Sequence, residues 1–162
     1  QGLTKETESV ARKMKELLGR EYDYDEMMRI PFLVHIPGLG SAKTIDTVGG
    51  QVDILPTLAN LMNLPVQQDY IFGSDLLNIR PEDGFYAPVT YMPVGSFMKG
   101  DFVYELGRDG TFESGRAFEM FTGEKRTLSK QWKEYSVKAR LLIETSKKVL
   151  DANLMKEEIS HP

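Results

Sequence analysis

The chain has 162 residues, of which 41% are hydrophobic and none is cysteine, and its formal net charge is −4. This composition is too apolar for a disordered chain, suits one domain or two small subdomains, and excludes disulfides, zinc–thiolate sites and cysteine nucleophiles. The acidic charge and the lack of a long basic run also exclude the electrostatic signature of a nucleic-acid-binding protein.

The first predicted element is a helix over Thr4–Leu18, which Gly19 can end as a C-cap. Its apolar residues fall on one side at helical spacing: Val10, Met14, Leu17 and Leu18. Next comes a cluster of two tyrosines and two methionines, Tyr22, Tyr24, Met27 and Met28. Such side chains can line a pocket, but packing onto a sheet is the commoner arrangement and is favoured here.

The stretch Arg29–Leu64 reads as strand, loop and helix. The strand is Ile30–Ile36, which is apolar on both faces except at His35, as expected when helices cover both sides of a parallel sheet. The rest of the chain supplies few neighbours for it, so we expect the other strands of that sheet to lie outside this chain. Apolar residues recur at helical spacing over Gln51–Asn63, and Asp53 is the predicted N-cap of a helix over Ile54–Asn63 that Asn63 and Pro65 end. Its apolar side comprises Val52, Leu55, Leu58, Ala59, Leu61 and Met62.

The second half predicts a small antiparallel sheet and a final helix. Its expected strands are Phe85–Tyr91, Phe97–Met98, Asp101–Leu106, Thr111–Glu113, Ala117–Phe121 and Arg126–Leu128. An Asp-Gly turn at Asp109 and a turn at Thr122–Lys125 separate the later ones. The helix begins near Ser129 and carries Trp132 on its apolar stripe. We therefore expect the Trp132 ring to point toward the sheet, with Tyr91, Phe102, Tyr104, Phe112 and Phe118 as candidate partners.

Candidate chemistry is sparse. His161 lies beside the terminus, and a lone histidine in an apolar strand, such as His35, is more often a hydrogen-bonded core residue than a ligand. The carboxylate clusters Glu6, Glu8, Asp23, Asp25 and Glu26 are better explained as solvated surface than as a cation site. Thr57 has no base or metal ligand beside it, and the charged turns 99–101 and 107–110 are only weak phosphate candidates. We assign no catalytic, cofactor-binding or metal-binding residue.

Several motifs carry a resemblance to a known family. They are Pro31, Phe32–Val34, His35, Pro37-Gly38, Gly49-Gly50-Gln51-Val52-Asp53 and Pro56-Thr57, followed more loosely by Gly73–Leu77, Thr122–Lys125 and Val149–Met155. The chain resembles the C-terminal part of the extracellular domain of lipoteichoic acid synthase-like phosphoglycerol transferases, in the sulfatase and alkaline-phosphatase-like superfamily. The family's metal-binding acid, threonine nucleophile and Asp-His pair would all lie before Gln1.

The resemblance implies an α/β fold: the edge of an alkaline-phosphatase-like sandwich over residues 1–77, and a small antiparallel sheet packed by a long helix over 78–162. It implies a non-catalytic piece that braces the missing N-terminal half of a metal-dependent transferase. For the parent it implies Mn²⁺ or another divalent ion, a lipid-linked glycerol phosphate substrate and the outer face of a cell membrane. The alternatives are a fragment of a sulfatase or phosphodiesterase-type hydrolase, and a stand-alone binding module.

Overall fold

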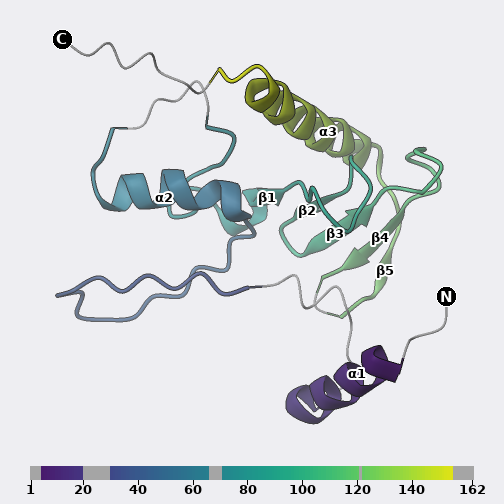
Figure 1. Ribbon diagram of the computed structural model, residues 1–162, viewed down its shortest axis with the longest axis horizontal. Coiled ribbons are helices and arrows are strands. Elements are labelled where there is room, and N and C mark those ends of the chain that lie inside the picture. Colours follow the sequence, from purple (N-terminus) through teal and green to yellow (C-terminus); the bar gives the residue numbers. More distant parts are fainter. Residues whose placement is uncertain (1–4, 20–29, 66–70, 121, 155–162) are drawn as a thin grey trace. The chain divides into compact units, whose positions relative to one another are not determined.

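The computed structural model describes residues 5–19, 30–65, 71–120 and 122–154 (Figure 1). The chain forms two compact units, residues 1–42 and 43–162. Within the described residues, no helix combines the length and the apolar character that crossing a membrane requires. The predicted division of the chain between residues 77 and 78 stays a prediction.

The first unit contains α1 (Lys5–Leu18), the helix predicted from the apolar stripe. Gly19 ends it with φ +69°, a left-handed conformation that glycine adopts without strain. The predicted strand Ile30–Ile36 is wrong as an element of this chain, because these residues join no strand and their side chains are exposed. A strand needs a hydrogen-bonding neighbour, and the chain provides none for this segment among the described residues. The Tyr22–Met28 cluster lies outside them.

The second unit begins with a short 3₁₀ turn, η2 (Gln51–Asp53), that leads into α2 (Ile54–Leu61). The helix ends as predicted, because Asn63 takes φ +51° and the Leu64 amide bonds back to the Ala59 carbonyl at 2.8 Å. This segment packs against the start of the sheet: a Cβ added to Gly50 would lie 2.3 Å from the Tyr86 ring. Another 3₁₀ turn, η4 (Pro81–Asp83), precedes the sheet.

Five antiparallel strands follow one another in chain order across a single sheet. They are β1 (Phe85–Tyr86), β2 (Phe97–Lys99), β3 (Phe102–Glu105), β4 (Arg116–Glu119) and β5 (Lys125–Arg126). The predicted strand Thr111–Glu113 is wrong: these residues belong to the loop between β3 and β4. The cause is local, because Asp109 accepts hydrogen bonds from the Thr111 amide and hydroxyl and closes a turn where a hairpin was expected.

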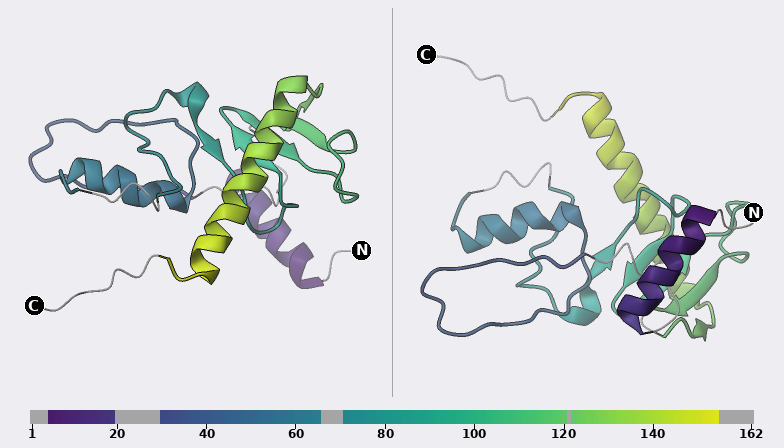
Figure 2. Two further views of the ribbon diagram at one scale, coloured as in Figure 1. Left: turned by 90° about the horizontal axis from the view of Figure 1, so that it is seen from above. Right: turned by 60° about the horizontal axis from the view of Figure 1, so that its bottom comes forward.

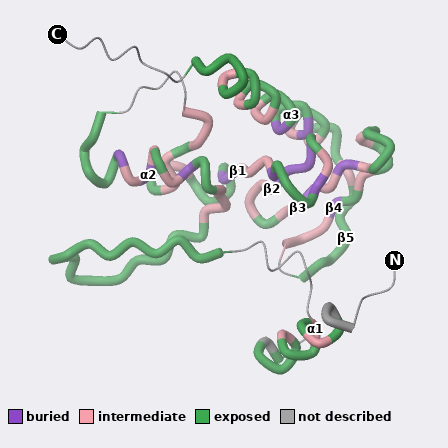
Figure 3. Tube along the Cα trace, in the orientation of Figure 1, coloured by how far each residue is buried: buried purple, intermediate pink, exposed green. Residues whose placement is uncertain are grey.

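The helix α3 (Lys130–Asp151) packs on one face of this sheet and runs on beyond it (Figure 2). The core lies between them and is formed by Phe97, Tyr104, Leu106, Ala117 and Ala139. Figure 3 shows buried positions on the strands, on the sheet-facing side of α3 and on α2. Trp132 points inward as predicted and is half-buried, with its ring 6.0 Å from that of Phe97 and 5.6 Å from that of Phe102.

Register decides which of the predicted Trp132 partners are available. Val103 pairs with Phe118, one residue out of step with Tyr104 and Ala117, so Phe118 lies on the sheet face away from α3. Tyr91 is also wrong as a partner, because its side chain is 74% exposed. The ring of Phe97, which sequence reasoning did not include, occupies the centre of the aromatic cluster instead.

Candidate docking interface

The start of α2 buries two polar side chains in addition to Ala59. Asp53 and Thr57, one turn apart, are only 3% and 2% exposed. The Asp53 carboxylate accepts hydrogen bonds from the backbone amides of Gly50 and Ser74, both at 2.6 Å. The Thr57 hydroxyl donates to the Asp53 carbonyl at 2.6 Å and accepts from the Leu76 amide at 3.0 Å. Together they fasten the loop at residues 73–77 to the start of α2.

The contacts change the prediction for Asp53 and agree with the one for Thr57, which was not read as a nucleophile. Asp53 does not cap α2 through its side chain, because its carboxylate bonds backward to Gly50 and across to Ser74. Thr57 is a structural residue, since its hydroxyl is used twice in backbone bonds. The loop approaches so closely that a Cβ on Gly73 would lie 2.0 Å from the Val52 carbonyl oxygen, so only glycine fits there.

The opposite side of α2 is apolar and faces outward. Val52, Leu55 and Met62, spaced at three and seven residues, are 55%, 59% and 64% exposed. We call these three side chains the α2 apolar face. The inner side of α2 also buries Ala59, so the helix is apolar on this outer side as well as toward the protein. Exposed apolar surface of this kind marks an interaction site. This face is therefore the candidate docking interface of the second unit.

The predicted chemical candidates do not assemble into a site. His35 is exposed in the first unit, and so is Glu8. His161, Asp23, Asp25 and Glu26 lie outside the described residues, as does the side chain of Glu6. Within the described part of the chain, no group of three or more histidine or acidic side chains could hold a metal ion.

Both charged turns serve the fold. Hydrogen bonds from Ser114 and then Thr111 lower the pKa of the exposed Asp109 carboxyl, whose oxygen closes the loop before β4. In the hairpin between β2 and β3, the Lys99 ammonium donates to the Glu82 carbonyl at 2.7 Å and lies 5.3 Å from the centre of the Tyr135 ring. The Asp109 and Lys99 side chains are therefore engaged in the fold, whereas the Arg108 side chain of the first turn is exposed.

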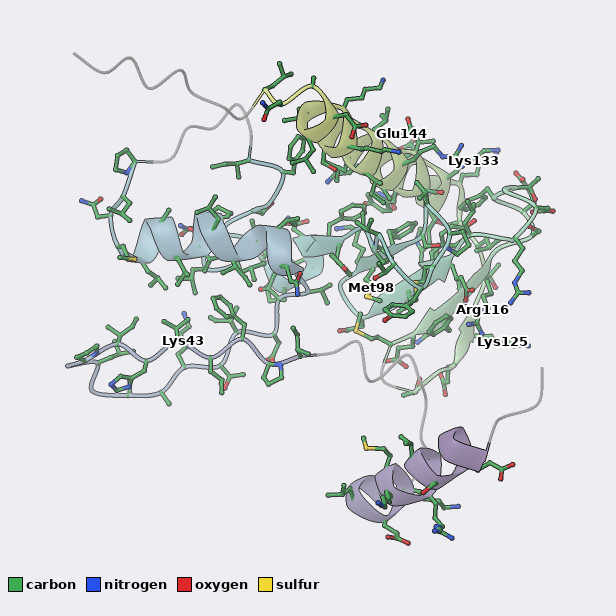
Figure 4. The ribbon with its side chains drawn as sticks, viewed as in Figure 1. Lys43, Met98, Arg116, Lys125, Lys133 and Glu144 are labelled. Carbon is green, nitrogen blue, oxygen red and sulfur yellow. The ribbon has the colours of Figure 1, made fainter. Side chains whose placement is uncertain are left out.

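The sheet face away from α3 is covered by its own side chains. In Figure 4, Lys133 and Glu144 project from α3, whereas Met98, Arg116 and Lys125 come from the strands. Arg116 pairs with Glu105 and lies over the Phe118 ring, and Val103 beneath is only 3% exposed. This face is therefore less open than the α2 apolar face.

Comparisons with known proteins identify relatives of this chain. No family model matches the sequence. The lipoteichoic acid synthase-like protein YvgJ of Bacillus subtilis is 32% identical over 149 residues, which cover 88% of this chain, and lipoteichoic acid synthase 1 of the same organism is 28% identical over 153 residues, or 93%. The crystal structure of the lipoteichoic acid synthase LtaP from Listeria monocytogenes matches 72% of the chain with 30% identity and a TM-score of 0.64. The chain is homologous to a part of the lipoteichoic acid synthases.

The chain corresponds to only a small part of each relative. This lipoteichoic acid synthase-like chain spans 22% of the length of each of the two curated relatives and 28% of the LtaP chain. Most of each relative therefore has no counterpart in these 162 residues. The LtaP match also confirms the predicted α/β fold with an antiparallel sheet and a C-terminal helix.

Proposed function

We propose that this chain is the non-catalytic C-terminal portion of a lipoteichoic acid synthase-like phosphoglycerol transferase of the sulfatase superfamily, and that it braces the catalytic half. The observation that carries the proposal is the exposed α2 apolar face, on which Val52, Leu55 and Met62 point outward. In the full protein that face packs on polypeptide outside this chain. Burial of apolar surface contributes about 25 cal/mol per Å², so covering three such side chains stabilises the contact.

The segment Ile30–Ile36 supports the same proposal from the first unit. Its apolar side chains are exposed, with Leu33 at 87% and Ile30 at 71%. An uncovered run of this kind is an aggregation hazard, and pairing with a neighbouring strand removes it. In our proposal, this segment becomes a strand of the central sheet when the catalytic half is present.

The chemistry of the parent belongs to that half. The described residues offer no cluster that could hold a metal ion, so they do not fit the Mn²⁺ implied by the family resemblance. In our proposal the ion, the nucleophile and the lipid-linked glycerol phosphate are bound by the catalytic half, at the outer face of the cell membrane. The stand-alone binding module is the second candidate, and it fits less well because it would leave both apolar segments in water.

Reconstitution tests the proposal. The chain and the catalytic half are produced separately, and their association is measured by calorimetry. Leu55→Glu places a charge on the α2 apolar face, and Asn60→Glu is the matched control at another exposed position of the same helix. We expect both variants to fold like the parent chain, Leu55→Glu to weaken association at least tenfold, and Asn60→Glu to leave it unchanged. Association that is insensitive to Leu55→Glu, or no association at all, would contradict the proposal.

A further inference from the structure

The outer side of α3, opposite the sheet, carries exposed apolar side chains on a charged helix. Val137 and Leu141, one turn apart, are 54% and 57% exposed. Together with Thr145 of the same helix, and with Phe72 from the loop before η4, they line an open groove. In the left view of Figure 2, α3 lies in front of the other described elements of the second unit. The outer side of α3 is therefore an uncovered apolar surface on a different helix from the α2 apolar face.

Two side chains of opposite charge lie at equal distances from Leu141 along this side of the helix. Glu134 precedes Leu141 by seven residues, and Lys148 follows it by seven. Seven residues make nearly two helical turns, so all three side chains fall on one stripe of α3. Glu134 and Lys148 are exposed, and neither side chain has a hydrogen bond or ion pair within the part of the chain that the structure describes. The stripe is therefore acidic at one end, apolar at its centre and basic at the other.

A stripe of this kind is complementary to a second copy of itself. When two α3 helices pack antiparallel about a two-fold axis at Leu141, the Glu134 of each copy lies opposite the Lys148 of the other. The two Leu141 side chains then meet at the axis, and Val137 of each copy lies opposite Thr145 of the other. A parallel arrangement in the same register would instead bring like charges together. The charges of α3 therefore favour the antiparallel pair.

A further pair of charges follows from the same arrangement. Lys138 and Glu144, three residues to either side of Leu141, lie opposite each other when the helices are antiparallel. The Lys138 ammonium already lies 4.4 Å from the centre of the Phe85 ring in this chain. Glu134 and Lys148, which have no such contact, therefore carry most of the charge complementarity.

We propose that the outer side of α3 is a self-association surface that pairs with a second copy of this chain, antiparallel, with Leu141 at the two-fold axis. Two-fold dimers are the commonest soluble oligomers, and the same patch of both copies makes their contact. Val137 and Leu141 supply the apolar centre, and the charges at the two ends set the register. One pair of helices is a small interface, so we expect a dissociation constant on the order of 10–100 μM. The contact does not depend on the function proposed above.

Exchanging the charges tests the register. Sedimentation equilibrium of the chain from about 5 to 500 μM is measured for the parent, for Glu134→Lys, for Lys148→Glu and for the variant with both substitutions. We expect each single substitution to raise the dissociation constant of the dimer at least tenfold, because like charges then face each other. The double variant restores opposite charges and should bind within threefold of the parent.

The double variant also separates pairing between copies from the stability of the helix. Within one α3, each substitution places like charges four residues apart, at positions 134 and 138 or at 144 and 148. The double variant carries both of these repulsions, so its recovery can come only from contact between copies. A parent chain that stays monomeric, or a double variant that binds no better than the single variants, overturns the proposal.

A second pair of variants distinguishes α3 from the α2 apolar face. Leu141→Glu brings two carboxylates together at the axis and should abolish the dimer, whereas Leu55→Glu should leave the dissociation constant within twofold of the parent. Both positions are exposed, so we expect both variants to melt like the parent chain at low concentration. Self-association that Leu55→Glu removes, or that Leu141→Glu leaves unchanged, overturns the proposal.

Discussion

Replacing Asp53 tests how the second unit is held together. The buried carboxylate accepts two backbone amides at 2.6 Å, from Gly50 and from Ser74, which lies 21 residues further along the chain. A hydrogen bond to a charged group contributes about 1.5–3 kcal/mol, so the two together stabilise the fold by about 3–6 kcal/mol. Asp53→Ala loses this stabilisation but also removes the cost of burying a charge. We therefore expect the free energy of unfolding to fall by about 3 kcal/mol. A helix N-cap alone would give only about 1 kcal/mol.

The assay is urea denaturation followed by circular dichroism, with amide hydrogen exchange at Gly50 and Ser74 measured by NMR. Asp75→Ala is the matched control, because Asp75 also accepts a backbone amide and a side-chain amide, but at the surface. We expect it to cost less than 1 kcal/mol. If Asp53→Ala loses no more than Asp75→Ala and exchange at Ser74 stays slow, the buried carboxylate is not what fastens the loop to α2.

Three further predictions concern the sheet and the chemistry. Trp132→Ala should destabilise the second unit by about 2–3 kcal/mol. This is less than the roughly 3–5 kcal/mol typical of fully buried aromatic residues, because the Trp132 ring is half-buried. A melting curve like that of Glu134→Ala, a variant at an exposed site, would contradict the docking of α3 on the sheet. Burial, reinforced by Glu113 and Asp109, raises the pKa of the Tyr104 phenol from 10.0 to about 12, so its contribution to stability is complete below pH 10 and is lost as the pH rises to 12. Denaturation at pH 9 and 11.5 should show this fall, and Tyr104→Phe should lack it. The isolated chain should show no metal-dependent hydrolysis of phosphodiesters or sulfate esters, and turnover abolished by mutating one of its residues would refute us.

Local patterns in the sequence determined the helices. The apolar stripe and Gly19 predicted α1, Asn63 marked the end of α2, and the stripe through Trp132 predicted α3. Each signal lies within a few residues of the feature it specifies, because capping and helical periodicity are local properties of the chain. The hairpin strands were also found where Gly100 turns the chain between β2 and β3. The family resemblance was also visible in the sequence, because its motifs are short segments that follow one another in a fixed order along the chain.

Tertiary structure decided everything that depends on distant residues. The sequence placed Val52, Leu55, Ala59 and Met62 together on the apolar side of a helix, but only the fold showed that Ala59 is buried while the other three are exposed. The helix is held in this orientation because a loop about 20 residues away bonds to Asp53 and Thr57. The role of Phe97 depended on strand register, which a local pattern leaves open. The segment Ile30–Ile36 has the composition of a buried strand and lacks neighbours among the described residues. A segment becomes a β-strand only when it pairs with a neighbouring strand, so the apolar sequence of Ile30–Ile36 was not sufficient to form one.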